Sequence, residues 1–222
     1  MKILIISSCT GEKKFTVPNC LTQKDFEKSS LFLKKREQEL NKYVIPAEYM
    51  YEGMQHKRLM QGINYMRRNS NNIEIDLYIL SAGYGLIKGN KPIAPYECTF
   101  SNMKKSEITA WADHIHIPKD IRNLLCNHYE LVILALGDKY LEACKFDKNF
   151  IFQNRTIVFC SNSNINRLPN ANNIIKIPLG NNEASKYKCG LIGLKGELTS
   201  RLLMKINEQG LNVIDSIFEQ KK

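Results

Sequence analysis

The sequence predicts an α/β fold with three layers, in which helices cover both faces of a mainly parallel central sheet. Three observations support this fold class. Continuously apolar runs at 2–7 and 130–136 are typical of strands that are buried on both faces of a sheet. Segments with helical periodicity alternate with the apolar runs, as parallel strands with crossover helices require. The 222 residues contain no clear linker, which indicates a single domain over 1–222.

The strands follow from apolar runs that are interrupted by turn residues. Five are expected, in chain order, at 2–7, 73–80, 130–136, 156–160 and 173–177. The run at 73–80 alternates polar and apolar residues before it becomes continuously apolar, and it ends at Ser81. Gly137 ends the third run.

The helices follow from apolar residues that recur at helical spacing between capping and breaking residues. They are expected at 22–42, 54–68, 105–114, 119–128, 138–144 and 197–208, with a short terminal helix after Gly210. Thr22 and Asp25 resemble a capping box for the first helix, and Pro46 breaks it. The glycine-rich segment 190–196 is expected to precede the helix at 197–208, where a helix N-terminus can bind phosphate.

Charge and cysteine content limit the class of protein. The 32 Lys and Arg residues exceed the 22 Asp and Glu residues, giving a formal net charge of +10. This balance favours a polyanionic partner such as nucleic acid or a phosphorylated ligand, and the alternative is solubility alone. Seven cysteines without a C-x-x-C pair are typical of reduced residues and predict a cytoplasmic protein. The N-terminal apolar run is too short to span a membrane, so no membrane partner is expected.

Chemistry is expected where the strands end, because ligands of open parallel sheets bind beyond the carboxyl ends of the strands. Polar or glycine-bearing segments stand at four such ends, namely 7–10, 81–85, 137–140 and 161–164. The glycines of the turn at 81–85 let the backbone approach a ligand closely, and Tyr84 offers a ring and a hydroxyl. An equally good interpretation is a tight turn in which Tyr84 fills the core.

Several segments resemble known bacterial proteins. Residues 78–87 (YILSAGYGLI) and 93–100 (IAPYECTF) resemble the "LSGLYGLL…PY" segment of YaaA-type peroxide stress proteins. The chain is more similar to short bacterial proteins with "SCGKRK", "YTG", "ILSAxxGLL…PYDLTL", "LAGRRY" and "GLGIGRQL" segments. The matching stretches here are SCTGEKK at 8–14, YEG at 51–53, LGDKY at 136–140 and GLIGLKGEL at 190–198. Glu97 keeps the acid that follows Pro-Tyr, whereas Asp138-Lys139 replaces the arginine before the later tyrosine.

This resemblance implies a fold similar to the uracil-DNA glycosylase superfamily. Some members of the wider group resemble phage-defence glycosylases that remove modified bases from viral DNA. The resemblance therefore implies a DNA N-glycosylase of antiviral defence, with DNA as its partner and no cofactor. Two alternatives stay open: a non-enzymatic DNA-binding stress-response protein of YaaA type, and an enzyme of free modified nucleosides.

Hydrolysis of an N-glycosidic bond needs a carboxylate near the anomeric carbon, donors for the departing base and a pocket for the flipped nucleotide. We expect Glu97 to be the carboxylate, Ser81 to bind the base, and Tyr84 and Tyr96 to stack on it. The other expected substrate-binding residues are Ser8, Cys9, Tyr51, Gly53, Gly83, Gly85, Gly137 and Tyr140. The expected contacts to DNA phosphate are Lys13, Lys14, His56, Lys139 and Lys195.

Three other kinds of chemistry have weaker support. His114 and His116 have no third ligand at useful spacing, so no metal is expected. Cys9 has lysines nearby but no partnered histidine, which favours a pocket-lining residue over a nucleophile. A lyase step would need a lysine that forms a Schiff base, and the sequence singles out none among so many lysines.

Overall fold

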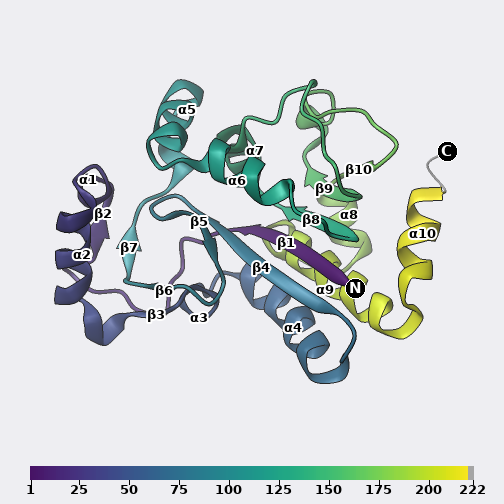
Figure 1. Ribbon diagram of the computed structural model, residues 1–222, viewed down its shortest axis with the longest axis horizontal. Coiled ribbons are helices and arrows are strands. Elements are labelled where there is room, and N and C mark those ends of the chain that lie inside the picture. Colours follow the sequence, from purple (N-terminus) through teal and green to yellow (C-terminus); the bar gives the residue numbers. More distant parts are fainter. Residues whose placement is uncertain (220–222) are drawn as a thin grey trace.

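The structure, a computed structural model, describes residues 1–219 and is a mixed α/β architecture with a mainly parallel central sheet flanked by helices (Figure 1). The strand order is β10-β9-β8-β1-β4-β5. The strand bounds are β1 Lys2–Ser8, β4 Glu74–Ser81, β5 Gly85–Lys88, β8 Leu131–Ala135, β9 Thr156–Cys160 and β10 Ile174–Pro178. The five expected strands are confirmed, and β5 adds an antiparallel edge that the sequence did not predict. Residues 220–222 of the expected single domain lie outside the described part.

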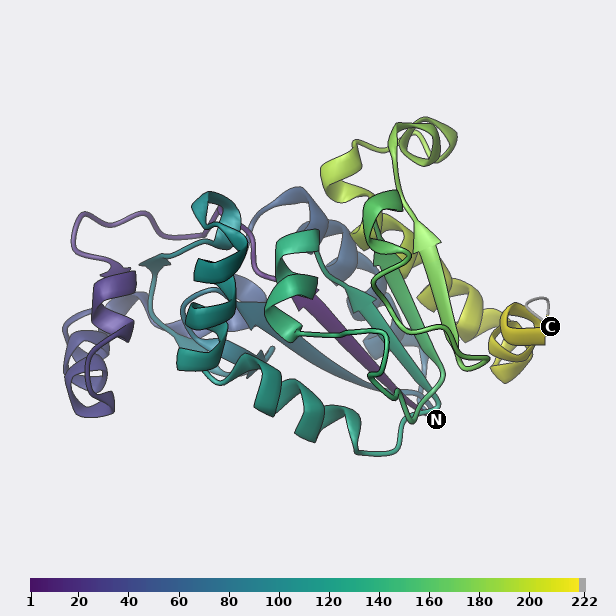
Figure 2. The ribbon, with the colours of Figure 1, turned by 90° about the horizontal axis from the view of Figure 1, so that it is seen from above.

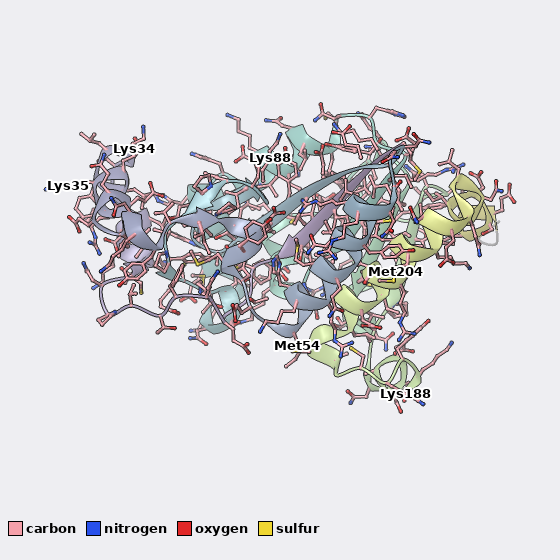
Figure 3. All side chains as sticks on the ribbon, turned by 90° about the horizontal axis from the view of Figure 1, so that it is seen from below. Lys34, Lys35, Met54, Lys88, Lys188 and Met204 are labelled. Carbon is pink, nitrogen blue, oxygen red and sulfur yellow. The ribbon has the colours of Figure 1, made fainter. Side chains whose placement is uncertain are left out.

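Helices cover both faces of the sheet. The helices α5, α6 and α7 lie over one face (Figure 2), and α4 and α9 lie over the other (Figure 3). Their bounds are α4 Met54–Asn69, α5 Lys105–His114, α6 Ile117–Leu125, α7 Asp138–Cys144, α8 Asn181–Lys186, α9 Leu191–Gln209 and α10 Leu211–Glu219. The residues 3–6 of β1 have no exposed surface, because the strand is central and covered on both faces.

The order of the strands reverses at β1. After β1 the chain adds β4 on one side of it and β8 on the other. Ser7 of β1 is in register with Ala135 of β8, so the segments that follow these two strands leave the sheet at the same edge. Ligands of doubly wound sheets commonly bind at such a reversal, which makes this edge the first place to look for a site.

The long loop after β4 is ordered by pairing with segments from the first quarter of the chain. β6 (Pro92–Ile93) pairs with β3 (Ile45–Pro46), next to the short helix α3 (Ala47–Met50). β7 (Tyr96–Glu97) runs parallel to β2 (Leu21–Thr22), so that Glu97 is in register with Thr22. A 3-10 helix follows at Phe100–Asn102. These pairings fix β7 at the rim of the sheet.

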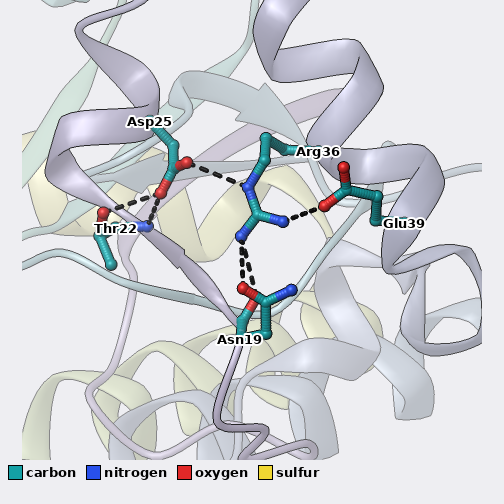
Figure 4. A network of polar contacts seen from close by, with 5 residues as sticks. All are labelled: Asn19, Thr22, Asp25, Arg36 and Glu39. Carbon is teal, nitrogen blue, oxygen red and sulfur yellow. Dashed lines mark hydrogen bonds and ion pairs between the residues drawn. The ribbon is translucent and has the colours of Figure 1, made fainter.

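The single helix expected over 22–42 is wrong. The chain forms α1 (Gln23–Phe26) and α2 (Ser30–Glu39), because Ser29 starts a new helix by accepting a hydrogen bond from the Phe32 N–H. Arg36 joins the two helices by binding Asp25 and the Asn19 carbonyl (Figure 4). None of the residues of α2 is buried, and Lys34 and Lys35 point outward from this end of the molecule (Figure 3).

The glycine-rich segment 190–196 is also different from the prediction. α9 begins at Leu191, so two of these glycines, Gly193 and Gly196, lie inside the helix instead of in a phosphate-binding loop before it. A Cβ at Gly196 would lie 2.0 Å from the Gln55 carbonyl oxygen of α4. The glycine therefore allows two helix backbones to approach closely, and its role is packing.

The helices of the described residues include none that is long and apolar enough to cross a membrane.

Candidate functional site

Strand β7 directs the side chains of two neighbouring residues of the Pro-Tyr-Glu segment to opposite sides. Successive side chains of a strand point in opposite directions. The Tyr96 side chain accordingly points into the core, where the residue is 1% exposed. The Glu97 side chain points outward and is 68% exposed. The structure thus gives these two predicted site residues different surroundings.

Tyr96 belongs to a buried cluster of hydroxyl groups, which we call the hydroxyl network and define as Ser81, Tyr96 and Tyr51. The Ser81 hydroxyl donates to the Tyr96 hydroxyl oxygen at 2.7 Å, and the Tyr96 and Tyr51 hydroxyls lie 2.9 Å apart. The Ser81 Oγ also accepts from the backbone N–H groups of Gly83 (3.2 Å) and Tyr84 (2.9 Å). Burial raises the pKa of Tyr51 and of Tyr96, so both phenols are neutral at physiological pH.

These contacts change the expected roles of Ser81 and Tyr96. The Ser81 hydroxyl and the backbone amides of the turn are occupied by one another, so they are not free to bind a base in this structure. The Tyr96 ring packs edge-on against Phe26 and Tyr84, with ring centroids 5.8 and 5.5 Å away. A ring with these neighbours and 1% exposure does not offer a stacking face, and Tyr96 therefore supports the site from below.

Tyr84 is half-buried in the same aromatic group. Its ring centroid lies 4.9 Å from that of Phe26, and its hydroxyl accepts a hydrogen bond from the Ala94 N–H at 3.1 Å. The two glycines of the turn have steric reasons to be glycine. A Cβ at Gly83 would lie 2.6 Å from the Phe26 ring, and Gly85 has a φ of +71° with the Ile115 carbonyl oxygen 2.7 Å from an added Cβ. The turn is thus a close-packed support.

Polar side chains join β1 to β8 at the reversal of strand order. The Cys9 Sγ lies 3.0 Å from the Tyr140 hydroxyl of α7. Burial raises the pKa of Tyr140, and the nearby Cys9 raises it further. Gln55 of α4 donates to Ser8 Oγ at 3.2 Å and to the Ala135 carbonyl at 2.9 Å. Ser8, Cys9 and Gln55 are buried at the expected ligand edge, and Tyr140 is partly buried. They form the floor of the candidate site.

Gln55 is a residue that the sequence interpretation missed. It shares the buried face of α4 with Leu59 and Ile63, at helical spacing. A polar amide on an otherwise apolar face needs partners, because an unpaired buried amide is costly. That pattern was a readable signal for a polar contact at the end of β1.

The loop after β1 is held against the segment that follows α3. Lys13 forms an isolated antiparallel bridge with Tyr51, and the Lys14 N–H donates to the Met50 carbonyl at 2.8 Å. The Gly53 N–H donates to Thr10 Oγ1 at 3.1 Å, and a Cβ at Gly53 would lie 2.6 Å from Thr10 Cβ. The expected Ser8-to-Lys14 and Tyr51-to-Gly53 segments are therefore in contact.

Lys13 and Glu97 form an ion pair at the rim of the hydroxyl network. The Lys13 Nζ lies 4.0 Å from Glu97 Oε1 and 4.5 Å from the centroid of the Tyr96 ring. It donates to the Gly11 carbonyl at 3.2 Å, and the Lys13 side chain is only 4% exposed. A fixed ammonium therefore stands beside an accessible carboxylate.

Glu97 lines an open groove of about 550 Å³, which we call the Glu97 groove. Among its lining residues are Gln23, Glu97, Cys98, Asn102, Glu107 and Trp111. The Trp111 N–H and the Cys98 thiol both point to the Ala82 carbonyl, at 2.7 and 3.2 Å, so the groove wall rests on the turn after β4.

The expected phosphate contacts have different surroundings. His56 is 1% exposed, its Nε2 lies 2.8 Å from the Glu48 carbonyl, and burial lowers its pKa, so a phosphate contact is excluded for this side chain. Lys139 donates to the carbonyls of Ser101 and Met103. Lys195 lies within α9, where burial lowers its pKa. Lys14 is exposed.

Gly137, one of the expected substrate-binding residues, is the N-cap of α7.

His114 and His116, which were not expected to bind a metal, have structural surroundings. His114 stacks on Trp111 with ring centroids 5.0 Å apart, and its Nε2 lies 3.2 Å from the Phe26 carbonyl. His116 stands before α6 with a φ of 60°.

Comparison with known proteins adds one finding. A comparison with curated proteins found no match. Residues 33–154, more than half of the 222 residues, match a family described as a "Family of unknown function (DUF6884)". The matched region contains the hydroxyl network, Glu97 and Tyr140, whereas Cys9 and Lys13 precede it. The chain therefore belongs to this family of unknown function, DUF6884.

Proposed function

We propose that the protein is a DNA N-glycosylase that hydrolyses the bond between a modified base and its deoxyribose and leaves an abasic site. One observation carries this proposal. Glu97 is an accessible carboxylate, 68% exposed in an open groove and 4.0 Å from the Nζ of a lysine whose side chain is buried. The neighbouring predicted residues are buried beneath it. Glu107 lines the same groove, but its carboxylate accepts the Lys104 N–H at the start of α5 at 2.6 Å.

The proposed chemistry centres on the charge of the Glu97 carboxylate. Departure of the base leaves positive charge on the sugar ring, which a carboxylate stabilises, and the same group can orient the attacking water. Gln23 and Asn102 line the same groove and carry amides that can donate to a departing base and accept from it. The groove volume of about 550 Å³ is within the range of small-molecule sites.

The choice of DNA as substrate rests on charge. The chain has a formal net charge of +10, and a positive protein gains affinity for DNA through the release of counterions. Exposed lysines such as Lys34 and Lys35 on α2 add positive charge to the surface at one end of the molecule (Figure 3). We propose a role in antiviral defence because the segments 78–87 and 93–100 resemble those of a group of bacterial proteins, and some members of the wider group resemble phage-defence glycosylases.

The test uses DNA purified from phages that carry modified bases, with unmodified DNA as a reference. Released base is measured by mass spectrometry, and abasic sites are measured as breaks after alkali treatment. We expect release from modified DNA by the wild-type protein and loss of at least about 100-fold in Glu97→Gln, the range of one acid or base group.

Glu52→Gln is the matched control, because Glu52 also pairs with a lysine, Lys57, at 3.4 Å but does not line the groove. It should release base at the wild-type rate. Equal release by Glu97→Gln would contradict the proposal. DNA binding without base release would favour a non-enzymatic DNA-binding protein. Base release only from free nucleosides would favour an enzyme of free modified nucleosides.

A further inference from the structure

Lys13 differs from the other ion-paired lysines of the described residues in the burial of its side chain. The side-chain exposure is 4% for Lys13, whereas it is 33% to 68% for Lys2, Lys57, Lys105 and Lys145. Among the ion-paired lysines of the described residues, Lys13 is thus the one whose side chain is buried.

The fold also fixes the position of this amine. The bridge between Lys13 and Tyr51 holds its backbone, and the flanking Glu52 N–H donates to the Glu12 carbonyl at 3.0 Å. Below the ammonium lies the ring of Tyr96, which is itself held by the hydroxyl network. A lysine held at both its backbone and its Nζ loses little further freedom when it reacts.

We propose that Lys13 gives the protein a second activity, the cleavage of DNA strands at abasic sites through an imine. This inference rests on the proposed function, because the abasic sugar would form beside Glu97. The Lys13 Nζ lies 4.0 Å from Glu97 Oε1, so a sugar carbon bound against this carboxylate would lie close to the amine. Lysine amines form Schiff bases with carbonyl groups, and the ring-opened abasic sugar has an aldehyde at C1′.

The reaction needs no oxidant or reductant. One ammonium proton passes to the Glu97 carboxylate, and the Nζ lone pair then bonds to C1′. The aldehyde oxygen takes one proton from the nitrogen and the proton held by Glu97, and it leaves as water, which gives the protonated imine and restores the Glu97 carboxylate. This carboxylate accepts a proton from C2′. The bond between C3′ and the 3′ phosphate oxygen then breaks, so that the phosphate leaves with the bonding electron pair. Water finally hydrolyses the imine and restores the amine.

The test uses a synthetic oligonucleotide with a preformed abasic site and sodium cyanoborohydride, which reduces an imine to a stable amine. The protein and DNA then migrate as one band in a denaturing gel. We expect this band with the wild-type protein and at least a tenfold loss in Lys13→Arg, which keeps the charge but not the nucleophile. Lys57→Arg is the matched control and should give the wild-type band.

Peptide mapping of the trapped adduct locates the modified lysine without any substitution, so the test does not depend on the folding of Lys13→Arg. A trapped peptide that contains Lys13 supports the proposal. No adduct, an adduct at another lysine, or equal trapping by Lys13→Arg would overturn it. The preformed abasic site supplies the sugar whether or not the protein releases bases, so this failure is distinguishable from failure of the glycosylase proposal.

Discussion

The hydroxyl network and the Glu97 groove lie on the two sides of one short strand, and they are built in opposite ways. On the inner side, Tyr96 is 1% exposed and its hydroxyl is bound by Ser81 and Tyr51. On the outer side, Glu97 is 68% exposed, and its carboxylate forms an ion pair with Lys13. We therefore propose different tasks for these adjacent motif residues: Tyr96 supports the site, and Glu97 contacts the ligand.

The difference has an energetic consequence. A buried hydroxyl or amide that loses its partner costs about 1–3 kcal/mol, whereas exchange of an exposed side chain usually changes stability by less than about 0.5 kcal/mol. Substitutions on the inner side should lower the free energy of unfolding, and substitutions at Glu97 should not.

The largest effect on stability is expected from Gly85→Ala. The φ of +71° disfavours a side chain, and the added Cβ would lie 2.7 Å from the Ile115 carbonyl oxygen. We expect a loss of about 4 kcal/mol, which combines left-handed strain with overpacking. Urea unfolding measures it. A loss below about 1 kcal/mol would show that the turn tolerates movement and that the support is not rigid.

Ser81→Ala should have the next largest effect. It removes the acceptor of two backbone N–H groups, from Gly83 and Tyr84, and the donor to Tyr96. The expected loss is about 2–3 kcal/mol in the free energy of unfolding. Ser101→Ala, which alters an exposed serine, is the control. Equal stability of the two variants would break the distinction between the inner and outer sides.

Tyr96→Phe should destabilise the protein by about 1–2 kcal/mol, because it removes one hydroxyl but keeps the ring that packs on Phe26. Calorimetry of the wild type and the variant measures the difference. An unchanged melting temperature would mean that the Ser81 and Tyr51 hydroxyls find other partners.

Alkaline pH should weaken the same network. Burial raises the pKa of Tyr51 and of Tyr96 above the ordinary 10, so the unfolded chain loses these protons first. Their contribution is therefore complete below pH 10 and is lost as the pH rises further. Above pH 10, each buried tyrosine makes the free energy of unfolding fall more steeply with pH, by about 1 kcal/mol per pH unit. Unfolding at pH 9 to 11 should show a shallower decline for Tyr96→Phe, and parallel declines would contradict this account.

The smallest effect on stability is expected from Glu97→Gln. The carboxylate is 68% exposed, and an exposed ion pair contributes little, so the change should stay under about 0.5 kcal/mol. Chemical denaturation with Glu52→Gln alongside measures it. A loss comparable to that of Ser81→Ala would place Glu97 among the supporting residues.

Periodicity predicted most of the fold, and the exceptions have physical causes. Apolar runs located all five parallel strands, because β1, β8 and β9 are buried almost throughout and β4 and β10 are buried in part. The start of α9 was placed six residues too late, since glycines usually break a helix but here permit contact with α4. The break at Ser29 was missed because a serine also fits within a charged helix.

The candidate site was predicted only in part. The sequence pointed to Ser81, Tyr96 and Glu97, but it could not tell which of them would be buried, because that depends on the pairing of β7 with β2. The burial of Lys13 arises from its bridge to Tyr51, 38 positions along the chain by their numbers. Such contacts between distant segments leave no periodic signal in the sequence.

The central claim is that Glu97 acts in chemistry and Tyr96 in support. The most direct test measures the rate of base release from modified phage DNA together with the free energy of unfolding, for Glu97→Gln and Tyr96→Phe side by side. We expect Glu97→Gln to lower the rate of base release by at least about 100-fold at unchanged stability. For Tyr96→Phe we expect the main effect to be a lower free energy of unfolding. Full release by a folded Glu97→Gln would contradict it.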